Sequence, residues 1–119
     1  MDFTPDSTIN KLILLFVLDK MEIPLSDNSI MDICTSRNTW LNYMDCKDIL
    51  WQLLETHFVY KTSDDNNECR YAITVDGRDC LSHFYLRIPQ SLRENITNFC
   101  KENRMEFKRS QEYVSEYIK

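Results

Sequence analysis

The sequence predicts a mainly helical domain with one small β-hairpin and a C-terminal helix. Several stretches place apolar residues three or four positions apart, the spacing of helices buried along one side. Two short runs rich in β-branched and aromatic residues, 58–62 and 69–74, flank a polar tip, which is the pattern of a hairpin. The 119 residues, 43% hydrophobic and 28% charged, have the size and composition of one globular domain.

The first helix is expected from Pro5 to about Lys20, because Thr4, Pro5 and Asp6 suit a helix start. Its apolar residues fall on two opposite faces. One face has Ile9, Leu12, Ile13, Phe16 and Val17, and the other has Leu14, Leu15 and Leu18. A helix that is apolar all round must be covered on both sides. The core of one domain covers only one face of this helix. The second apolar face therefore predicts a further layer of structure packed against it.

Two further helices are expected before the hairpin. Ser26 is the expected cap of a helix over residues 27–35, and Asp45 is the expected cap of one that continues to Glu55. The connection between them is expected to be irregular or extended. The later helix has a stripe of apolar residues that predicts its buried side: Cys46, Ile49, Leu50, Leu53 and Leu54.

The turn after this helix, residues 55–58, lacks the glycine that often takes a left-handed conformation at such a position. Histidine tolerates this conformation better than bulky β-branched residues do. We therefore expect a positive φ at His57, or at Thr56 if the helix ends one residue earlier.

Two helices are expected after the hairpin. Thr74 is the expected cap of the first, which continues to about Leu86. Pro89, with a capping box formed by Ser91 and Glu94, is expected to open the second. The apolar stripe of this last helix comprises Leu92, Ile96, Phe99 and Cys100. Beyond residue 103 the sequence fits either a helix or a strand, and the choice between them stays open.

This order of elements, three helices followed by a two-stranded wing, is that of a winged helix-turn-helix domain. The sequence therefore predicts a mainly α fold with a small β-hairpin wing and a C-terminal helix. Residues 1–88 are predicted to form the winged helix-turn-helix domain. Residues 89–119 are predicted to form a C-terminal helical segment that serves as a dimerisation element.

The single glycine, Gly77, lies in the pattern Y-x-I-T-x-x-G-R-x-x-L, which begins at Tyr71 and ends at Leu81. This pattern resembles the junction after the wing in bacterial winged-helix regulators of the PadR and MarR types. The resemblance implies that Thr74 caps the helix after the wing. It also implies that Gly77 lets this helix turn hard against the domain body, where a Cβ atom would collide.

A narrower resemblance covers roughly residues 8–104. The stretches NKLILLFVLDKMEIPLS and FYLRIPQSLRENITNFCKEN are similar to a family of uncharacterised bacterial winged-helix proteins, catalogued as a domain of unknown function. The most specific shared feature is the step formed by Arg87, Ile88 and Pro89 before the last helix. The resemblance implies a transcriptional regulator, with no established ligand or operator and no catalytic residues to carry over.

The charge of the chain gives only partial support to DNA binding, which depends largely on lysine and arginine contacts to phosphates. The chain has 14 basic and 19 acidic residues, a net charge of −5, and residues 1–60 hold four of the basic and nine of the acidic ones. Asp48 and Glu55 lie opposite the apolar stripe of the third helix, and the wing tip, 64–68, is acidic as well. The candidate contacts to bases and phosphates are Arg37, Asn42, Tyr43, Lys47, Gln52, Lys61 and Arg70.

Of these candidates, Lys61 and Arg70 fall on the two wing strands. We expect them either to straddle one phosphate or to be solvated charges of the strands. Trp51 is predicted to point away from the core, as tryptophans of contact surfaces do, unless a neighbouring loop covers it.

A homodimer is expected from the first helix. Burying a leucine contributes about 1.5–3 kcal/mol, so the uncovered face of this helix needs a cover. The predicted two-fold interface comprises Leu14, Leu15, Leu18, Leu92, Ile96 and Phe99. The alternative is that the last helix covers these leucines within one chain. If the dimer forms, Leu15→Glu is expected to break it without unfolding the chain.

Two functions therefore stay open. The first is a DNA-binding transcriptional regulator of winged-helix type that acts as a homodimer. The alternative is a winged-helix module for protein–protein interaction that does not bind DNA. Basic groups gathered on one face would favour the regulator, and scattered ones would favour the interaction module.

Other classes of protein have little support in the sequence. It lacks nucleophile-elbow, phosphate-loop and zinc-protease motifs, so we expect no enzyme activity and no cofactor. The five cysteines include no C-x-x-C pair and are expected to act as small apolar residues rather than as metal ligands. With no basic stretch at the start and no apolar run near the roughly 20 residues of a membrane span, a cytoplasmic protein is expected.

Overall fold

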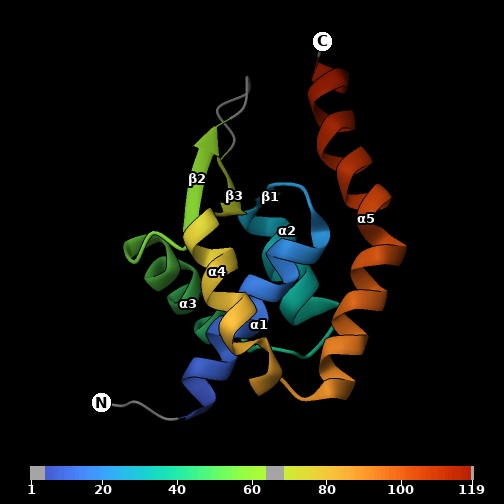
Figure 1. Cartoon of the computed structure of the whole chain (residues 1–119). Helices are drawn as coiled ribbons and strands as arrows, with labels where there is room; N and C mark the ends of the chain where they lie inside the picture. Colours follow the sequence, from blue (N-terminus) through green and yellow to red (C-terminus); the bar gives the residue numbers. More distant parts are fainter. Residues whose placement is uncertain (1–4, 64–68, 119) are drawn as a thin grey trace.

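A computed structural model describes residues 5–63 and 69–118, with side chains described over 8–63 and 69–109. In chain order the elements are α1 (Pro5–Met21), β1 (Leu25–Ser26), α2 (Asp27–Met31), the π-helical turn η1 (Asp32–Ser36), α3 (Tyr43–Glu55), β2 (Val59–Ser63), β3 (Cys69–Ile73), α4 (Val75–Phe84), the 3₁₀ turn η2 (Tyr85–Arg87) and α5 (Gln90–Ile118) (Figure 1). The fold is mostly helical, with a small antiparallel sheet and a C-terminal helix. This confirms the predicted fold class and is compatible with a winged-helix-like fold.

The sheet has three antiparallel strands in the order β1-β3-β2. β2 and β3 form the predicted hairpin, with Val59 opposite Ile73 at its base. The short link before α2, predicted only to be extended, forms β1, in which Leu25 pairs with Tyr71. Strand β1 thereby links the segment between α1 and α2 to the wing strand β3.

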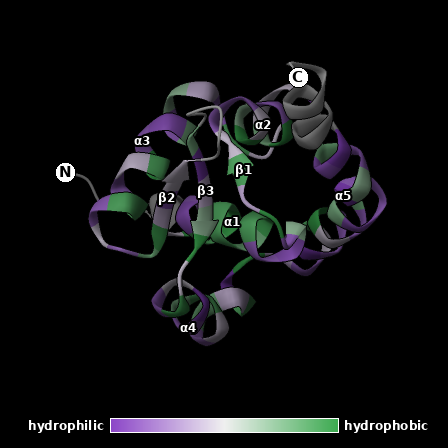
Figure 2. Cartoon of the chain, turned by 90° about the horizontal axis from the view of Figure 1, so that it is seen from above, coloured by the Kyte–Doolittle hydropathy of each residue, from purple (hydrophilic) through white to green (hydrophobic). Residues whose placement is uncertain are grey.

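Helix α1 lies in the middle of the molecule, with α3, α4 and α5 around it (Figure 2). Every residue from Leu12 to Leu18 is buried. Besides the three helices, α1 contacts the wing strand β3. The apolar character of α1 on all sides is therefore matched by cover on all sides.

The side chains assigned to a dimer interface all pack into the core of a single chain. The buried ones are Leu14, Leu15, Leu18 and Ile96, and the half-buried ones are Leu92 and Phe99. The inference that α1 exposes an apolar face to a second copy is therefore wrong. Its physical reason is that α3, α4, α5 and the wing strand β3 together surround α1 within the same chain, and Leu15 packs beside α3 and α4. The homodimer itself stays a prediction.

The start of α3 differs from the sequence prediction. The helix begins at Tyr43, and its cap is Asn42 rather than Asp45. The side-chain oxygen Oδ1 of Asn42 accepts a hydrogen bond from the backbone N–H of Asp45 at 2.8 Å. Asp45 thus lies in the first turn, where its negative charge suits the positive end of the helix dipole.

The start of α5 also differs, because the helix begins at Gln90 and Ser91 lies within its first turn. The predicted capping box of Ser91 and Glu94 is therefore wrong. Instead, the side-chain amide of Gln90 donates to the Glu94 carboxylate at 3.1 Å. The segment beyond residue 103, for which the sequence fitted helix and strand equally, continues as helix to Ile118.

Gly77 occupies the position that the wing-to-helix junction predicted. Thr74 caps α4, and its hydroxyl accepts the Gly77 N–H at 3.0 Å. The carbonyl oxygen of Phe58 lies directly against the start of the helix, where it accepts the Thr74 N–H at 3.0 Å. A Cβ atom on Gly77 would collide with this carbonyl oxygen and would lie 2.8 Å from Cγ1 of Ile73. The predicted need for glycine is confirmed.

His57 has a φ of 65°, which confirms the predicted left-handed turn after α3. Its N–H donates to the Leu54 carbonyl at 3.2 Å, and the N–H of Phe58 donates to the Leu53 carbonyl at 3.0 Å. These two bonds form a Schellman motif, which satisfies the last carbonyls of the helix and turns the chain into β2.

Substitutions at His57 are expected to follow its backbone conformation. His57→Val should lower the free energy of unfolding by about 1–2 kcal/mol, because a β-branched residue is strained at positive φ. His57→Gly should leave the free energy of unfolding unchanged or raise it by up to about 1 kcal/mol, because glycine adopts this conformation without strain. Urea unfolding of the two variants checks the prediction. A His57→Val variant as stable as the parent chain would contradict the assigned turn.

Candidate nucleic-acid interface

The exposed side of α3 carries apolar and acidic groups. Cys46, Ile49, Leu50 and Leu53 face the core. On the outer side, Met44 is 69% exposed and Trp51 is 63% exposed, which confirms the prediction that Trp51 points away from the core. Asp48 and Glu55 are exposed on the same side. The middle of this helix therefore offers carboxylates and large apolar side chains, rather than cations.

The N-terminal end of α3 brings together three of the predicted DNA contacts. Asn42 is engaged as the helix cap, and its amide nitrogen also donates to the Asp45 carboxylate at 3.0 Å. Tyr43 is 55% exposed. The ammonium of Lys47 lies 5.6 Å from the centre of the Tyr43 ring and 3.2 Å from the Asp27 carboxylate. The hydrogen bond to Asp27 raises the pKa of Lys47.

Arg37 lies away from this end of α3 and connects η1 to α5. Its Nε donates to the Asp32 carboxylate at 3.0 Å, and its Nη2 donates to the Glu106 carboxylate at 2.8 Å. Its guanidinium also lies 4.8 Å from the centre of the Phe107 ring. The hydrogen bond from Arg37 lowers the pKa of Glu106, so this carboxylate stays charged in its pair. The structure thus places Arg37 in the docking of α5 rather than on a surface with the other cations.

The two wing cations lie on opposite faces of the hairpin. Lys61 pairs with Tyr71 across the ladder, whereas Arg70 pairs with Thr62. Residues opposite each other in a ladder share a face, and consecutive residues of a strand alternate faces. Lys61 and Arg70 therefore do not straddle one phosphate, which corrects that expectation. The acidic wing tip, 64–68, lies outside the described residues.

The remaining candidate, Gln52, is half-buried on α3. Tyr43 and Lys47 are thus the predicted contacts that the fold gathers into one exposed cluster at the start of α3. Asn42 lies beside them as the helix cap. The others are dispersed: Arg37 follows η1, Gln52 lies in a later turn of α3, and Lys61 and Arg70 lie on the two faces of the wing.

Three of the five cysteines lie in the core. Cys34, Cys46 and Cys100 are buried, Cys80 is half-buried and Cys69 is exposed. Burial raises the pKa of Cys100 to about 12. The pKa of Cys34 is raised by a hydrogen bond with Cys46 and by burial. Within the part of the chain that the structure describes, no three His, Cys, Asp or Glu side chains form a group suited to a metal ion.

Alkylation of the native protein is expected to modify Cys69 first. Cys80 should react more slowly, because burial raises its pKa and leaves less thiolate. The three buried cysteines should react only in denaturant. Mass spectrometry after timed iodoacetamide treatment measures these rates, and rapid modification of Cys34 in native buffer would contradict its buried placement.

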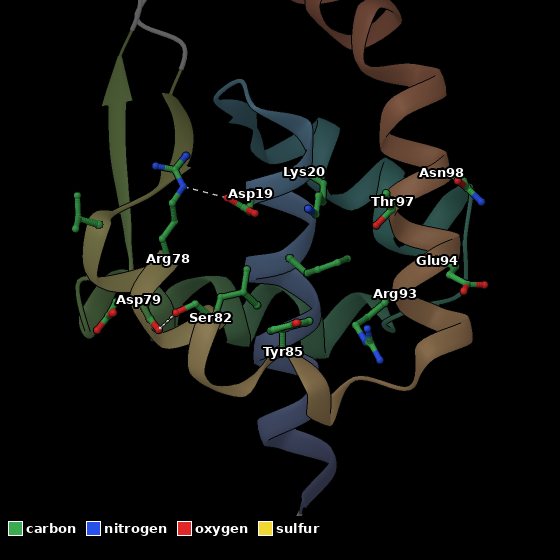
Figure 3. A pocket seen from close by; sticks show the side chains of 13 residues that line it. Asp19, Lys20, Arg78, Asp79, Ser82, Tyr85, Arg93, Glu94, Thr97 and Asn98 are labelled. Atoms are coloured by element: carbon green, nitrogen blue, oxygen red, sulfur yellow. Dashed lines mark hydrogen bonds and ion pairs between the residues drawn. The ribbon is translucent and has the colours of Figure 1, made fainter.

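Sequence reasoning missed a groove of about 810 Å³ between α1, α4 and α5 (Figure 3). Its lining combines apolar side chains with Lys20, Arg78 and Arg93. The local sequence contains no signal for it, because the lining comes from three helices that are far apart along the chain. Across the described residues, none of the helices is both long and apolar enough to span a bilayer.

Comparison with known families gives one result. A family model described as Domain of unknown function (DUF4364) matches residues 10–119. This agrees with the resemblance carried by the Arg-Ile-Pro step, which falls within the matched range. No curated protein and no solved structure matches the chain.

Proposed function

The chain belongs to the DUF4364 family, and from this premise we propose that it is a non-catalytic transcriptional regulator of winged-helix type that binds duplex DNA as a homodimer. The observation that supports this function is the position of Tyr43 and Lys47. Both are exposed in the first two turns of α3, which follows α2 in helix-turn-helix order and precedes the wing. In helix-turn-helix proteins the N-terminal residues of this helix contact the bases.

Lys47 is available to a phosphate despite its ion pair. Its side chain is 44% exposed and that of Asp27 is 41% exposed. Exposed ion pairs contribute about 0–1 kcal/mol, so exchanging Asp27 for a phosphate has a small cost. Arg37 is different, because two carboxylates and an aromatic ring already engage it. We therefore leave Arg37 out of the expected DNA contacts.

Binding is expected to be weak and steeply dependent on salt. With Lys47, Lys61 and Arg70 as phosphate contacts, the slope of log K against log salt should be about −2.7 for one chain and about −5.4 for a dimer. Lys61→Ala and Arg70→Ala should each weaken binding evenly across sequences and make the slope less steep by about 1 unit per chain. Fluorescence anisotropy on random duplex DNA, between roughly 50 and 200 mM salt, measures both quantities.

Lys101→Ala is the matched control for this experiment, since Lys101 is an exposed cation on α5 and not a predicted contact. It should change the affinity and the slope far less than Lys61→Ala does. Absence of duplex binding at low salt, or an affinity unaffected by both wing substitutions, would contradict the DNA-binding function.

The second function, a winged-helix module for protein–protein interaction, has two observations in its favour. The predicted cations are scattered, with Arg37 at α5 and Lys61 and Arg70 on opposite faces of the wing. The outer side of α3 presents Met44 and Trp51 to solvent, flanked by Asp48 and Glu55. Large exposed apolar side chains with carboxylates suit a basic protein partner better than they suit phosphates. Asp48→Lys separates the two functions. If α3 enters a DNA groove, Asp48→Lys should raise the affinity for duplex DNA several-fold. If α3 serves only protein contacts, neither the parent chain nor the Asp48→Lys variant should bind duplex DNA.

The homodimer rests on the length of α5 rather than on α1. The 29 residues of α5 span about 43 Å. The last turns of α5 extend beyond α2 (Figure 1). Met105, on the outward side, is 56% exposed. Light scattering should give twice the chain mass of 14.3 kDa, and Met105→Glu should reduce it to the single-chain mass without unfolding. A mass near that of one chain for the parent protein at micromolar concentration would contradict the dimer.

A further inference from the structure

We propose that the groove between α1, α4 and α5 binds a small carboxylate with an apolar body, whose anionic group is held by Lys20 and Arg93. This ligand site does not depend on DNA binding, and separate measurements test it. It rests on three features of the groove: an apolar floor, two cations without carboxylate partners, and lining acids that are engaged or turned outward.

The floor of the groove suits an apolar ligand body. Phe16 of α1 and Leu81 of α4 are buried beneath it, and Tyr85 of η2 lines it with a partly exposed ring. Most of the lining surface is apolar. The volume falls in the range of about 300–1,000 Å³ that is typical of small-molecule sites, which commonly combine an apolar lining with a few polar groups.

The cations are held in place by neighbouring aromatic rings. The Lys20 ammonium lies 5.4 Å from the centre of the Phe16 ring, and the Arg93 guanidinium lies 5.5 Å from the centre of the Tyr85 ring. Arg93 is further oriented by a hydrogen bond from its Nε to the Ile88 carbonyl at 3.0 Å. Counting only described residues, neither cation forms an ion pair, and the Nη groups of Arg93 have no hydrogen-bond acceptor.

The carboxylates that line the same groove are committed elsewhere. Asp19 accepts from Arg78 at 3.0 Å, which links α1 to α4 (Figure 3). Glu94 accepts from Gln90 on its own helix. The Asp79 side chain is 73% exposed to solvent. Glu94 keeps its charge but points away from Lys20 and Arg93 (Figure 3). Positive charge in the groove is therefore concentrated at the Lys20 and Arg93 side chains, next to aromatic rings, which favours an anion with an apolar body.

A ligand in this position would contact α5 through Arg93 and the domain body through Lys20. It would therefore connect α5 to α1 and raise the thermal stability of the native chain by mass action. If the chain also regulates transcription, this linkage gives the ligand a route to the geometry of α5.

The test uses two probes of the same shape, 1-naphthoate and the uncharged 1-naphthalenemethanol, titrated into the full chain by calorimetry. We expect 1-naphthoate to bind roughly tenfold more tightly than the alcohol, as a charge-assisted hydrogen bond predicts. Lys20→Gln and Arg93→Gln should each remove most of this difference, while Lys101→Gln, at an exposed cation of α5 outside the groove, should preserve it. Equal binding of the two probes, or a difference that survives both substitutions, would overturn the proposal.

A second variant keeps the test decisive if loss of Arg93 disturbs the fold. Ser82 is exposed on α4 and lines the groove, so Ser82→Trp should fill it without opening the core. This variant should unfold at a temperature near that of the parent and lose binding of 1-naphthoate. Retained binding in Ser82→Trp, or no binding of 1-naphthoate to the parent chain, would overturn the assignment.

Discussion

Replacing Leu15 with glutamate is expected to unfold the chain. Leu15 lies in the middle of α1 and is 1% exposed. A carboxylate at this position would lose most of its hydration, because the residues around it are mainly apolar, with Lys11 and Arg87 on the rim of the same cavity. The free energy of unfolding should fall by at least about 4 kcal/mol, against a total of about 5–15 kcal/mol for a typical domain. Circular dichroism and urea unfolding measure the loss.

Leu86→Glu is the matched control for this substitution. Leu86 is 69% exposed, so the same change there should shift the free energy of unfolding by no more than about 0.5 kcal/mol. A folded Leu15→Glu protein of unchanged stability would show that Leu15 faces solvent or a separable partner. That result would restore the original sequence-based expectation, in which this substitution breaks a dimer and leaves the fold intact.

Gly77→Ala is expected to be the most damaging single-methyl change in the chain. The added Cβ would meet the carbonyl oxygen of Phe58 and the Ile73 side chain, at 2.8 Å from its Cγ1. The carbonyl belongs to the backbone between α3 and β2, so relief requires α4 to move away from the wing. We expect the free energy of unfolding to fall by about 3 kcal/mol. Alanine's better helix propensity offsets only about 1 kcal/mol of the clash.

Ser82→Ala provides the comparison within the same helix. Ser82 is exposed, and its hydroxyl donates only to the Asp79 carbonyl of its own helix, at 2.9 Å. Its replacement should change the free energy of unfolding by less than about 0.5 kcal/mol. Thermal unfolding of both variants at one protein concentration gives the comparison. Equal stabilities for Gly77→Ala and Ser82→Ala would contradict the close approach of α4 to the Phe58 carbonyl.

Helix caps and turn conformations were predictable from the sequence where only one nearby residue suits the position. Thr74 was recognised as a cap because a hydroxyl accepts the first free N–H groups of a helix. His57 was recognised as a left-handed residue because the turn after α3 lacks glycine. Asn42 was missed as the cap of α3, because Asn42 and Asp45 are both good capping residues and only the path of the preceding connection selects one.

The candidate site was less predictable than the fold. Arg37 and Lys47 were identified as cations available to phosphates, and the structure gives both of them carboxylate partners: Asp32 and Glu106 for Arg37, and Asp27 for Lys47. The partner at Glu106 comes from α5, 69 residues further along the chain. Contacts at that separation depend on how the helices pack, and sequence spacing carries no information about them.

The sequence by itself determined the order of the helices, the hairpin and the need for glycine at position 77, because these depend on periodicity and on backbone conformations set by neighbouring residues. Only the tertiary structure decided what covers α1, which cations stay available and where a groove opens. The sequence showed that Leu14, Leu15 and Leu18 require a cover, and both α5 of the same chain and a second copy could have supplied it. The hydrophobic effect is non-directional, so the need to bury these leucines does not tell which element covers them. Other elements of the same chain supply that cover, and Leu15 lines a cavity with Leu53 of α3 and Phe84 of α4.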